Sequence, residues 1–347
     1  MFKIQKPFLL SVLTLMLLSS LQSCGTPQKA KLKALIIDGQ NNHGAWPKTS
    51  IMMKSYLEET GLFEVDIERT NYMWIGPHFN KIEGVKKIEE LLEMYPIDTE
   101  KRTLVENPKA DPDFSPNFEA YDVVISNFGW KTANWPDATK RNFEKYMRNG
   151  GGFVLIHAAN NAWGDWEAYN EIIALGGWGG RNTESGPYVY YDVNNELKHD
   201  TSEGPCASHG PQLEYQLKTR APEHPIMKGL PDTWLHAKDE LYERLRGPAK
   251  NMTVLATAFS GTEADATKTD KNKGRTGRHE PLLMAVEYGK GRIFHSALGH
   301  MDYSMECVGF ITTLQRGAEW AATGKVTQSI PEDFPAANTV SARKFKQ

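Results

Sequence analysis

The chain has 347 residues, with 40 Lys or Arg against 43 Asp or Glu, and its formal net charge is −3. This balance excludes a basic protein that holds nucleic acid by charge, so we expect no nucleic-acid partner. Because 40% of the residues are hydrophobic, a largely disordered acidic chain is excluded too. Three Cys residues are too few for a fold built on disulfides.

Residues 1–23 have the pattern of a bacterial export signal. Lys3 and Lys6 precede an apolar run over residues 8–18, and no acidic residue occurs before Cys24. The run is too short to span a bilayer, which takes about 20 residues. Residues 21–24 resemble the lipobox of bacterial lipoproteins, in which the Cys becomes lipidated. A plain cleaved signal with an incidental Cys is the alternative.

Cleavage after residue 23 removes two Lys and no acidic residue, so the remaining 324 residues carry a net charge of −5. We expect the protein to be exported and lipid-anchored to a bacterial membrane, facing the periplasm or the surface. Residues 24–32 are its tether. Cys206 and Cys307 then lie in an oxidising compartment. Nothing in their spacing pairs them or indicates a metal site, so we expect two free thiols.

The first part of the mature chain alternates between strand and helix patterns. Residues 34–37 form a continuous apolar run, which is typical of a strand buried on both faces. A helical pattern around residues 51–56 follows, and residues 63–67 alternate like a strand. Residues 70–119 are polar and indicate an inserted connection, with a predicted helix over 82–94.

The alternation continues with apolar strands predicted at 123–125 and 153–156. Predicted helices over 136–148 and 165–175 follow them, the second ending at paired glycines. Strands that alternate with helices favour a parallel α/β sheet.

After residue 186 the strands follow one another with few helices between them. The predicted strands and the final helix cover residues 188–193, 214–218, 254–259, 282–297 with a hairpin turn at 288–292, and 306–322. No linker separates two cores, so we predict a single α/β domain over residues 33–335, followed by a C-terminal tail over 336–347.

Polar side chains directly follow the three apolar strands. Asn41 and His43 come after the first strand, Asn127 after the second, and His157 and Asn160 after the third. Ligands of parallel α/β sheets bind beyond the carboxyl ends of the strands. We therefore predict a polar cleft there, although any of these Asn residues could instead only fix a turn.

His157 stands where a strand runs into a turn of small residues, between GGFVLI and Ala158-Ala159. This pattern is typical of a nucleophile elbow, which presents one side chain at the top of a sheet. Related α/β enzymes have Ser or Cys there, whereas an imidazole can transfer a proton or bind a metal. Without a Cys at the elbow, the chain is not a glutamine amidotransferase. A hydrogen-bonded structural His is the alternative.

The second half of the chain supplies carboxylates and further His residues. Asp239 and Glu240 are adjacent, so on an extended segment they point to opposite faces and at most one faces the cleft. A carboxylate beside a His is an acid/base pair or two ligands of a metal; a salt bridge to a neighbouring cation is the alternative. His209 and His300 both lie beside Gly, where they can reach a cleft.

Metal and sugar binding are both compatible with this composition. His43, His157 and His209 are candidate ligands of a divalent metal, but no HxxxH, HxH or HExxH spacing demands one. Six Trp residues, Trp163 among them, occur in the first half. Aromatic faces beside Asn and Arg side chains such as Arg181 suit a sugar ring, although packing in the core is the alternative.

Five motifs resemble the ThuA-like (trehalose utilisation) family. They are DGQNNHGAW (38–46), GGFVLIHAANNAW (151–163), LGGWGGR (175–181), DELY (239–242) and YGKGRIFHSALGH (288–300). The resemblance implies a class I glutamine amidotransferase-like, flavodoxin-like fold: a doubly wound, mostly parallel sheet with additional strands in the C-terminal half. It also implies a link to 3-keto-glycosides, which partner sugar dehydrogenases make. Some members place a His shortly after the glycines at 176–180, where this chain has Trp178 and Arg181.

Two functions follow as hypotheses. The first is an enzyme that acts on keto-sugars or 3-keto-glycosides by acid/base elimination, hydrolysis or isomerisation. Its expected catalytic residues are His157, Glu240, Asp239 and His300; its expected substrate-binding residues are Asn41, His43, Asn127, Asn160, Trp163, Arg181 and His209. The alternative is a non-catalytic surface lipoprotein that binds carbohydrate or a partner protein. An enzyme should bring the His and carboxylate side chains within about 4 Å of a common point, whereas a binder should not.

Overall fold

The computed structural model describes residues 1–3, 30–77, 79–261 and 275–346. The predicted export signal and Cys24 lie outside these residues, apart from positions 1–3. Residues 31–347 form one compact unit. In the described part of the chain, no helix is long and apolar enough to cross a membrane.

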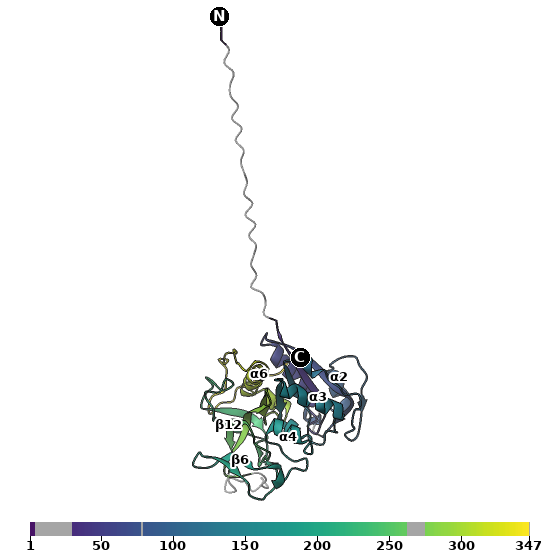
Figure 1. Ribbon diagram of the computed structural model, residues 1–347, viewed down its shortest axis with the longest axis vertical. Helices are drawn as coiled ribbons and strands as arrows, with labels where there is room; N and C mark the ends of the chain where they lie inside the picture. Colours follow the sequence, from purple (N-terminus) through teal and green to yellow (C-terminus); the bar gives the residue numbers. More distant parts are fainter. Residues whose placement is uncertain (4–29, 78, 262–274, 347) are drawn as a thin grey trace. The chain divides into compact units, whose positions relative to one another are not determined.

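The centre of this unit is a parallel sheet (Figure 1). Strand β1 (Leu32–Asn41) lies between β2 (Phe63–Ile75) and β4 (Val123–Ser126), followed by β5 (Gly152–Ile156) and β14 (Gly291–Ser296), and all these neighbours pair in parallel. The short apolar runs predicted from the sequence are therefore its central strands. Their carboxyl ends share one edge of the sheet.

Strands from the C-terminal half extend the sheet in antiparallel pairing. Beyond β14 come β13 (His279–Tyr288), β12 (Met252–Phe259), β9 (Leu213–Thr219) and β10 (Thr233–Asp239). The other short strands are β3 (Thr103–Leu104), β6 (Tyr188–Tyr191), β7 (Leu197–Asp200), β8 (Ser208–His209) and β11 (Tyr242–Glu243). The predicted α/β fold with added C-terminal strands is confirmed.

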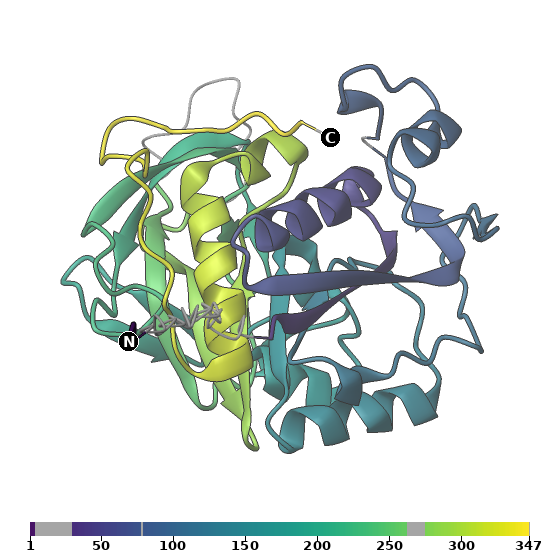
Figure 2. The same cartoon turned by 90° about the horizontal axis from the view of Figure 1, so that it is seen from above.

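Helices cover both faces of the parallel strands. They are α1 (Trp46–Glu58), α2 (Ile88–Met94), α3 (Asp137–Arg148), α4 (Glu167–Ile173), α5 (Asp302–Met305) and α6 (Val308–Thr323). Figure 2 shows α1 and α6 on one side of the parallel strands and α3 on the other.

Alternation along the central strands creates two separate hydrophobic cores. Ala34 and Ile36 of β1 belong to the core that contains residues of α1 and α6, whereas Leu35 and Ile37 belong to the core that contains residues of α3 and α4. Successive side chains of a strand point to opposite faces, so a continuous apolar run fills both cores. This arrangement fixes the strand ends, where the site lies.

Three boundaries differ from the sequence predictions. The helix predicted over 82–94 begins only at Ile88, because Gly84 adopts a left-handed conformation with φ +80°. Strand β2 extends to Ile75, into the segment predicted as an insertion. The final helix begins at Val308, because Cys307 before it is extended; the residues predicted as its start lie after the separate helix α5, which ends at Met305.

The C-terminal tail packs on the domain, and Cys206 and Cys307 are placed within it. Tail residues 336–346 lie against the domain: the Val308 N–H donates to the Ser341 carbonyl, and Phe345 packs edge-on against Tyr56. Cys206 is half-buried and Cys307 is buried, both as free thiols.

Candidate active site

Four side chains from four strand ends meet beside the sheet. His43 follows β1, His157 follows β5, His300 follows β14, and Glu240 follows β10. One nitrogen or oxygen atom of each lies within 4.8 Å of the others, and all four residues are buried. Three of these strands, β1, β5 and β14, belong to the parallel central sheet, and their carboxyl ends lie where the strand-end rule places a site. This donor set could hold a metal ion, and we call it the His-Glu cluster.

His157 enters the cluster through a sharp turn. Strand β5 runs into a short 3₁₀ helix, and His157 at the junction has φ +47°. For a residue other than Gly, this backbone conformation costs about 1–3 kcal/mol. Its Nδ1 lies 2.8 Å from the Ala297 carbonyl oxygen, which can only accept, so Nδ1 carries the proton. Nε2 therefore presents a lone pair to His300 Nδ1 at 3.3 Å and to Glu240 Oε2 at 3.8 Å.

The environment favours the neutral form of His157 and the ionised form of Glu240. Burial, and then the neighbouring His300, lower the pKa of His157 to about 4, so it is neutral at pH 7. Burial acts to raise the pKa of Glu240, but the hydrogen bond from His300 at 2.9 Å and the other imidazoles lower it below its usual value. At neutral pH the cluster therefore contains an ionised carboxylate beside a neutral imidazole.

Asp239 ties the two site loops of the C-terminal half together. Its Oδ2 accepts hydrogen bonds from His236 Nε2 at 2.9 Å and from the Gly299 N–H at 2.7 Å. Its Oδ1 accepts from the N–H groups of Glu240 at 2.9 Å and His300 at 3.0 Å. Burial acts to raise its pKa, but the bond from His236 and the other donors hold it at about 2. Asp239 thus faces away from the cleft and positions Glu240.

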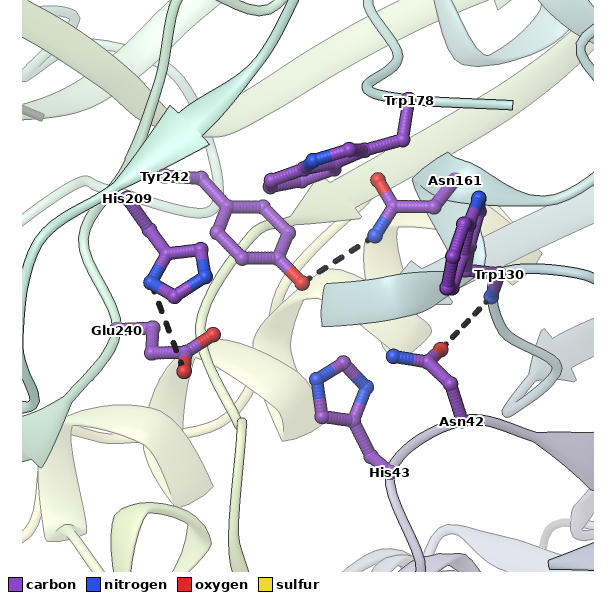
Figure 3. Close-up of a pocket in the computed structure, with 8 residues that line it drawn as sticks. All are labelled: Asn42, His43, Trp130, Asn161, Trp178, His209, Glu240 and Tyr242. Carbon is purple, nitrogen blue, oxygen red and sulfur yellow. Dashed lines mark hydrogen bonds and ion pairs between the residues drawn. The ribbon is translucent and has the colours of Figure 1, made fainter. Parts of the chain in front are cut away.

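A cavity of about 220 Å³ opens beside the cluster. Its lining residues in the described chain are Asn42, His43, Trp130, Asn161, Trp178, His209, Glu240 and Tyr242 (Figure 3). The Trp178 and Tyr242 rings meet edge-to-face with centroids 5.0 Å apart. His209 Nδ1 lies 3.6 Å from Glu240 Oε1, and the His209 side chain is 41% exposed. Glu240 therefore turns one oxygen to the buried imidazoles and the other to the cavity.

Two of the predicted substrate-binding Asn residues hold turns of the fold. The Asn41 amide donates to the carbonyl oxygens of Asn127 and Phe128, and its Oδ1 accepts from the His43 N–H at 2.8 Å. The Asn127 amide donates to the Trp46 carbonyl and to nearby hydroxyls of α1. Asn41 thereby places His43. Neither Asn residue lines the cavity described above, but both border the smaller pocket beside His157 and His300. Their binding of substrate stays a prediction, which these contacts do not favour.

Three further predicted binding residues are also engaged in the fold, whereas His43 and His209 line the cavity. The Asn160 amide lies 3.0 Å from His295 Nε2, and Arg181 donates to the carbonyl oxygens of Gly177 and residue 162. Trp163 packs edge-on in a buried aromatic group with centroids as close as 4.6 Å. These contacts keep the turns behind the cavity in place. Contact of these three residues with a substrate remains a prediction.

Five cavity residues were not among the predicted site residues: Asn42, Trp130, Asn161, Trp178 and Tyr242. Tyr242 reaches the cavity because β11 pairs with β8, which sets Tyr242 opposite His209. The Tyr242 hydroxyl accepts from the Asn161 amide at 3.3 Å, and Asn42 Oδ1 accepts from the Trp130 N–H at 2.9 Å. The DELY motif contained a signal for Tyr242, because it stands two residues after Glu240.

Comparison with known proteins identifies the family. The ThuA family, described as Trehalose utilisation, matches residues 70–321. The chain belongs to the ThuA family. A ThuA-like protein from Parabacteroides merdae is 41% identical over 90% of this chain and 98% of its own, with a TM-score of 0.73. A ThuA-like protein from Bacteroides uniformis, 19% identical over 87% of this chain and 97% of its own, has the same fold with a TM-score of 0.51. Comparison with curated proteins gives no match.

The family comparison confirms the resemblance drawn from the five sequence motifs. Membership of a family described as Trehalose utilisation links this ThuA chain to carbohydrates in general terms. Trp178, in the glycine-rich motif where some members place a His, forms a wall of the cavity. Its large aromatic face therefore borders the space in which a ligand of the cavity would bind.

Proposed function

We propose that this ThuA protein is an enzyme that acts on keto-sugars, with 3-keto-glycosides as the substrate class, by acid/base chemistry. The observation that carries the proposal is the pairing of Glu240 with His209 on the wall of an aromatic cavity, 3.6 Å apart. The description of the family supports a carbohydrate substrate. The substrate class itself comes from the resemblance to the family.

The cavity suits a single sugar ring. Its volume of about 220 Å³ lies below the range of roughly 300–1,000 Å³ that is usual for drug-sized ligands. Trp130, Trp178 and Tyr242 offer faces for the apolar C–H groups of a sugar, while Asn42 and Asn161 offer amides for its hydroxyls. The leaving group of a glycoside would extend past the exposed side of His209 toward solvent.

The acid/base pair fits β-elimination from a 3-keto-glycoside. The ketone at C3 acidifies the C2 proton, which the Glu240 carboxylate removes. The electron pair forms the C1–C2 double bond and the C1–O bond breaks, while His209 donates a proton to the departing oxygen. Addition of water to the double bond completes a hydrolysis. If the C1–O bond stays intact, the electron pair instead forms a C2–C3 enediolate. Transfer of the C2 hydroxyl proton to O3 and return of the abstracted proton to C3 then give the isomeric 2-keto sugar.

The buried imidazoles favour the enzyme over the alternative, a carbohydrate-binding lipoprotein without activity. A binder needs aromatic faces and amides, but it gains nothing from a buried carboxylate surrounded by His43, His157 and His300. Removing such charged and polar groups from water is costly unless they are paired. Their convergence within 4.8 Å supports the proposal of an enzyme.

Incubation of the purified chain with 3-keto-glucosides tests the proposal. We expect release of the aglycone or an isomerised sugar, with kcat/KM reduced by about 100-fold or more in Glu240→Gln, since a general base contributes about 10²–10⁴-fold. The matched control is His199→Gln, an exposed His on β7. No turnover, together with sugar binding that Glu240→Gln leaves unchanged, would favour the non-catalytic binder.

We also propose that Cys24 carries a lipid anchor and that a sugar dehydrogenase supplies the keto-sugar upstream. The n-region, the apolar run and the lipobox-like residues 21–24 support the anchor. Cys24→Ser should move the chain from the membrane fraction to the soluble fraction after expression in a bacterial host. A membrane fraction that is unchanged by this substitution would contradict the anchor.

A further inference from the structure

We propose that His43, His157, His300 and Glu240 bind one divalent transition-metal ion, with an open coordination position facing the cavity. Metal binding itself stands on the geometry of the cluster. Its role in turnover rests on the proposed function, because the ion would act on the ketone of the sugar.

The spacing of the four donor atoms fits one ion. Ligands held at about 2.0–2.2 Å from a common metal lie at most about 4.4 Å from one another. His300 Nδ1 lies 2.9 Å from Glu240 Oε2 and 3.3 Å from His157 Nε2, and His157 Nε2 lies 3.8 Å from Glu240 Oε2. The whole set falls within 4.8 Å. A shift of a few tenths of an ångström brings all four into range.

The protonation of His157 is already that of a ligand. Its Nδ1–H donates to the Ala297 carbonyl, so the lone pair on Nε2 points into the cluster. A metal-binding His characteristically donates its other ring N–H to such a second partner. The Nε2 lone pair and the Glu240 carboxylate both face His300 Nδ1, whose single proton can serve only one of them. A dication between them would attract both.

The backbone around the cluster is fixed independently of any ion. Asp239 accepts the N–H groups of both Glu240 and His300, and the Asn41 side chain accepts the His43 N–H. Three of the four ligand positions are thus held by side chains that do not themselves face the cluster. This preorganisation lowers the entropy cost of collecting ligands from four separate loops.

The donor types select the class of metal. Three imidazoles and one carboxylate suit Zn²⁺, Mn²⁺, Fe²⁺, Co²⁺ or Ni²⁺, whereas Mg²⁺ and Ca²⁺ prefer oxygen ligands. His43 and Glu240 line the cavity, while His157 and His300 lie behind them, so the cavity side is where a further ligand can approach. A bound ion would polarise a sugar ketone as a Lewis acid and stabilise the enolate that proton removal creates.

Metal binding is tested on the full chain purified without a polyhistidine tag. After dialysis against EDTA, isothermal titration with Zn²⁺ and Mn²⁺ should give about one ion per chain, and Mg²⁺ should bind at least about 100-fold more weakly. His300→Ala and Glu240→Gln should each weaken binding of the preferred ion by about 100-fold or more, and His199→Ala should leave it unchanged. Far-UV circular dichroism checks folding; where His300→Ala does not fold, Glu240→Gln decides.

Three outcomes would overturn the site: no saturable binding, Mg²⁺ binding as tightly as Zn²⁺ and Mn²⁺, or binding that survives both cluster substitutions in folded protein. Failure of the site is distinguishable from failure of the proposed function. Turnover of a keto-glycoside by the metal-free chain would refute the role of the ion but keep the acid/base pair. Stoichiometric metal binding without turnover of any keto-glycoside would keep the site and refute the function.

Discussion

Replacing Asp239 by Asn should destabilise the protein and loosen the site together. The Asp239 carboxylate is fully buried and accepts four hydrogen bonds, two on each oxygen. An Asn side chain keeps one oxygen and turns an NH₂ group toward the other two donors. Those two donors lose their acceptor in a site that water does not reach, and the Glu240 and His300 loops lose their common anchor.

The magnitude follows from two separate estimates. The pKa of Asp239 falls from 3.8 to about 2, and this shift corresponds to about 2–3 kcal/mol of stabilisation at neutral pH. Two buried donors left unpaired cost about 1–3 kcal/mol each. From both estimates we expect Asp239→Asn to lose about 3 kcal/mol of unfolding free energy.

Urea denaturation at pH 7 measures this loss, with Asp232→Asn, at an exposed position before β10, as the matched control. Because the pKa of Asp239 is lowered by folding, its stabilisation is complete above pH 3.8 and is lost as the pH falls toward 2. The gap between the native protein and Asp239→Asn should therefore narrow over that range. A variant within about 1 kcal/mol of the native protein at pH 7 would refute the reasoning.

Three further substitutions probe other parts of the account. Trp178→Ala should raise KM for a keto-glycoside by about tenfold, as expected for loss of an aromatic contact, and a KM that does not change in steady-state assays would remove Trp178 from the binding wall. Burial lowers the pKa of His295 to about 4, so below pH 6.5 the unfolded state binds a proton that the folded state does not bind. The native protein should therefore lose unfolding free energy between pH 7 and pH 4.5, and His295→Gln should lose about 2–3 kcal/mol less over the same range. Equal losses for the two proteins in urea titrations would contradict this. Gly317→Ala should lower the thermal midpoint despite the better helix propensity of Ala, because the added Cβ would lie 2.1 Å from the Phe294 ring; a higher midpoint would show that the ring can move aside.

The central fold was predictable because its strands are short apolar runs. Both faces of these runs are buried, so every side chain along them is apolar and each run is visible in the sequence. The runs are residues 34–37, 123–125 and 153–156. The position of β10 was not predicted, because its apolar residues are interrupted by His236 and by Lys238. The buried His236 is bonded to Asp239 and packs against Tyr215, and no local pattern reveals these contacts.

The site was predicted in part for the same reason. The position of a side chain directly after a strand shows that it lies at the sheet edge, which located His43, His157 and His300. It does not show whether the side chain turns into the cleft or back into the fold. Asn127 turns back because its donors meet hydroxyls of α1 about 80 positions away in sequence. Tyr242 enters the cavity through the pairing of β11 with β8, which is likewise remote in sequence.

The most direct test of the central claim follows the C2 proton of a 3-keto-glycoside by NMR in D₂O. If Glu240 removes this proton, the wild-type chain should place deuterium at C2 of the recovered sugar or its product, and Glu240→Gln should slow incorporation by about 100-fold or more. Release of the aglycone with the original C2 proton fully retained would contradict the account.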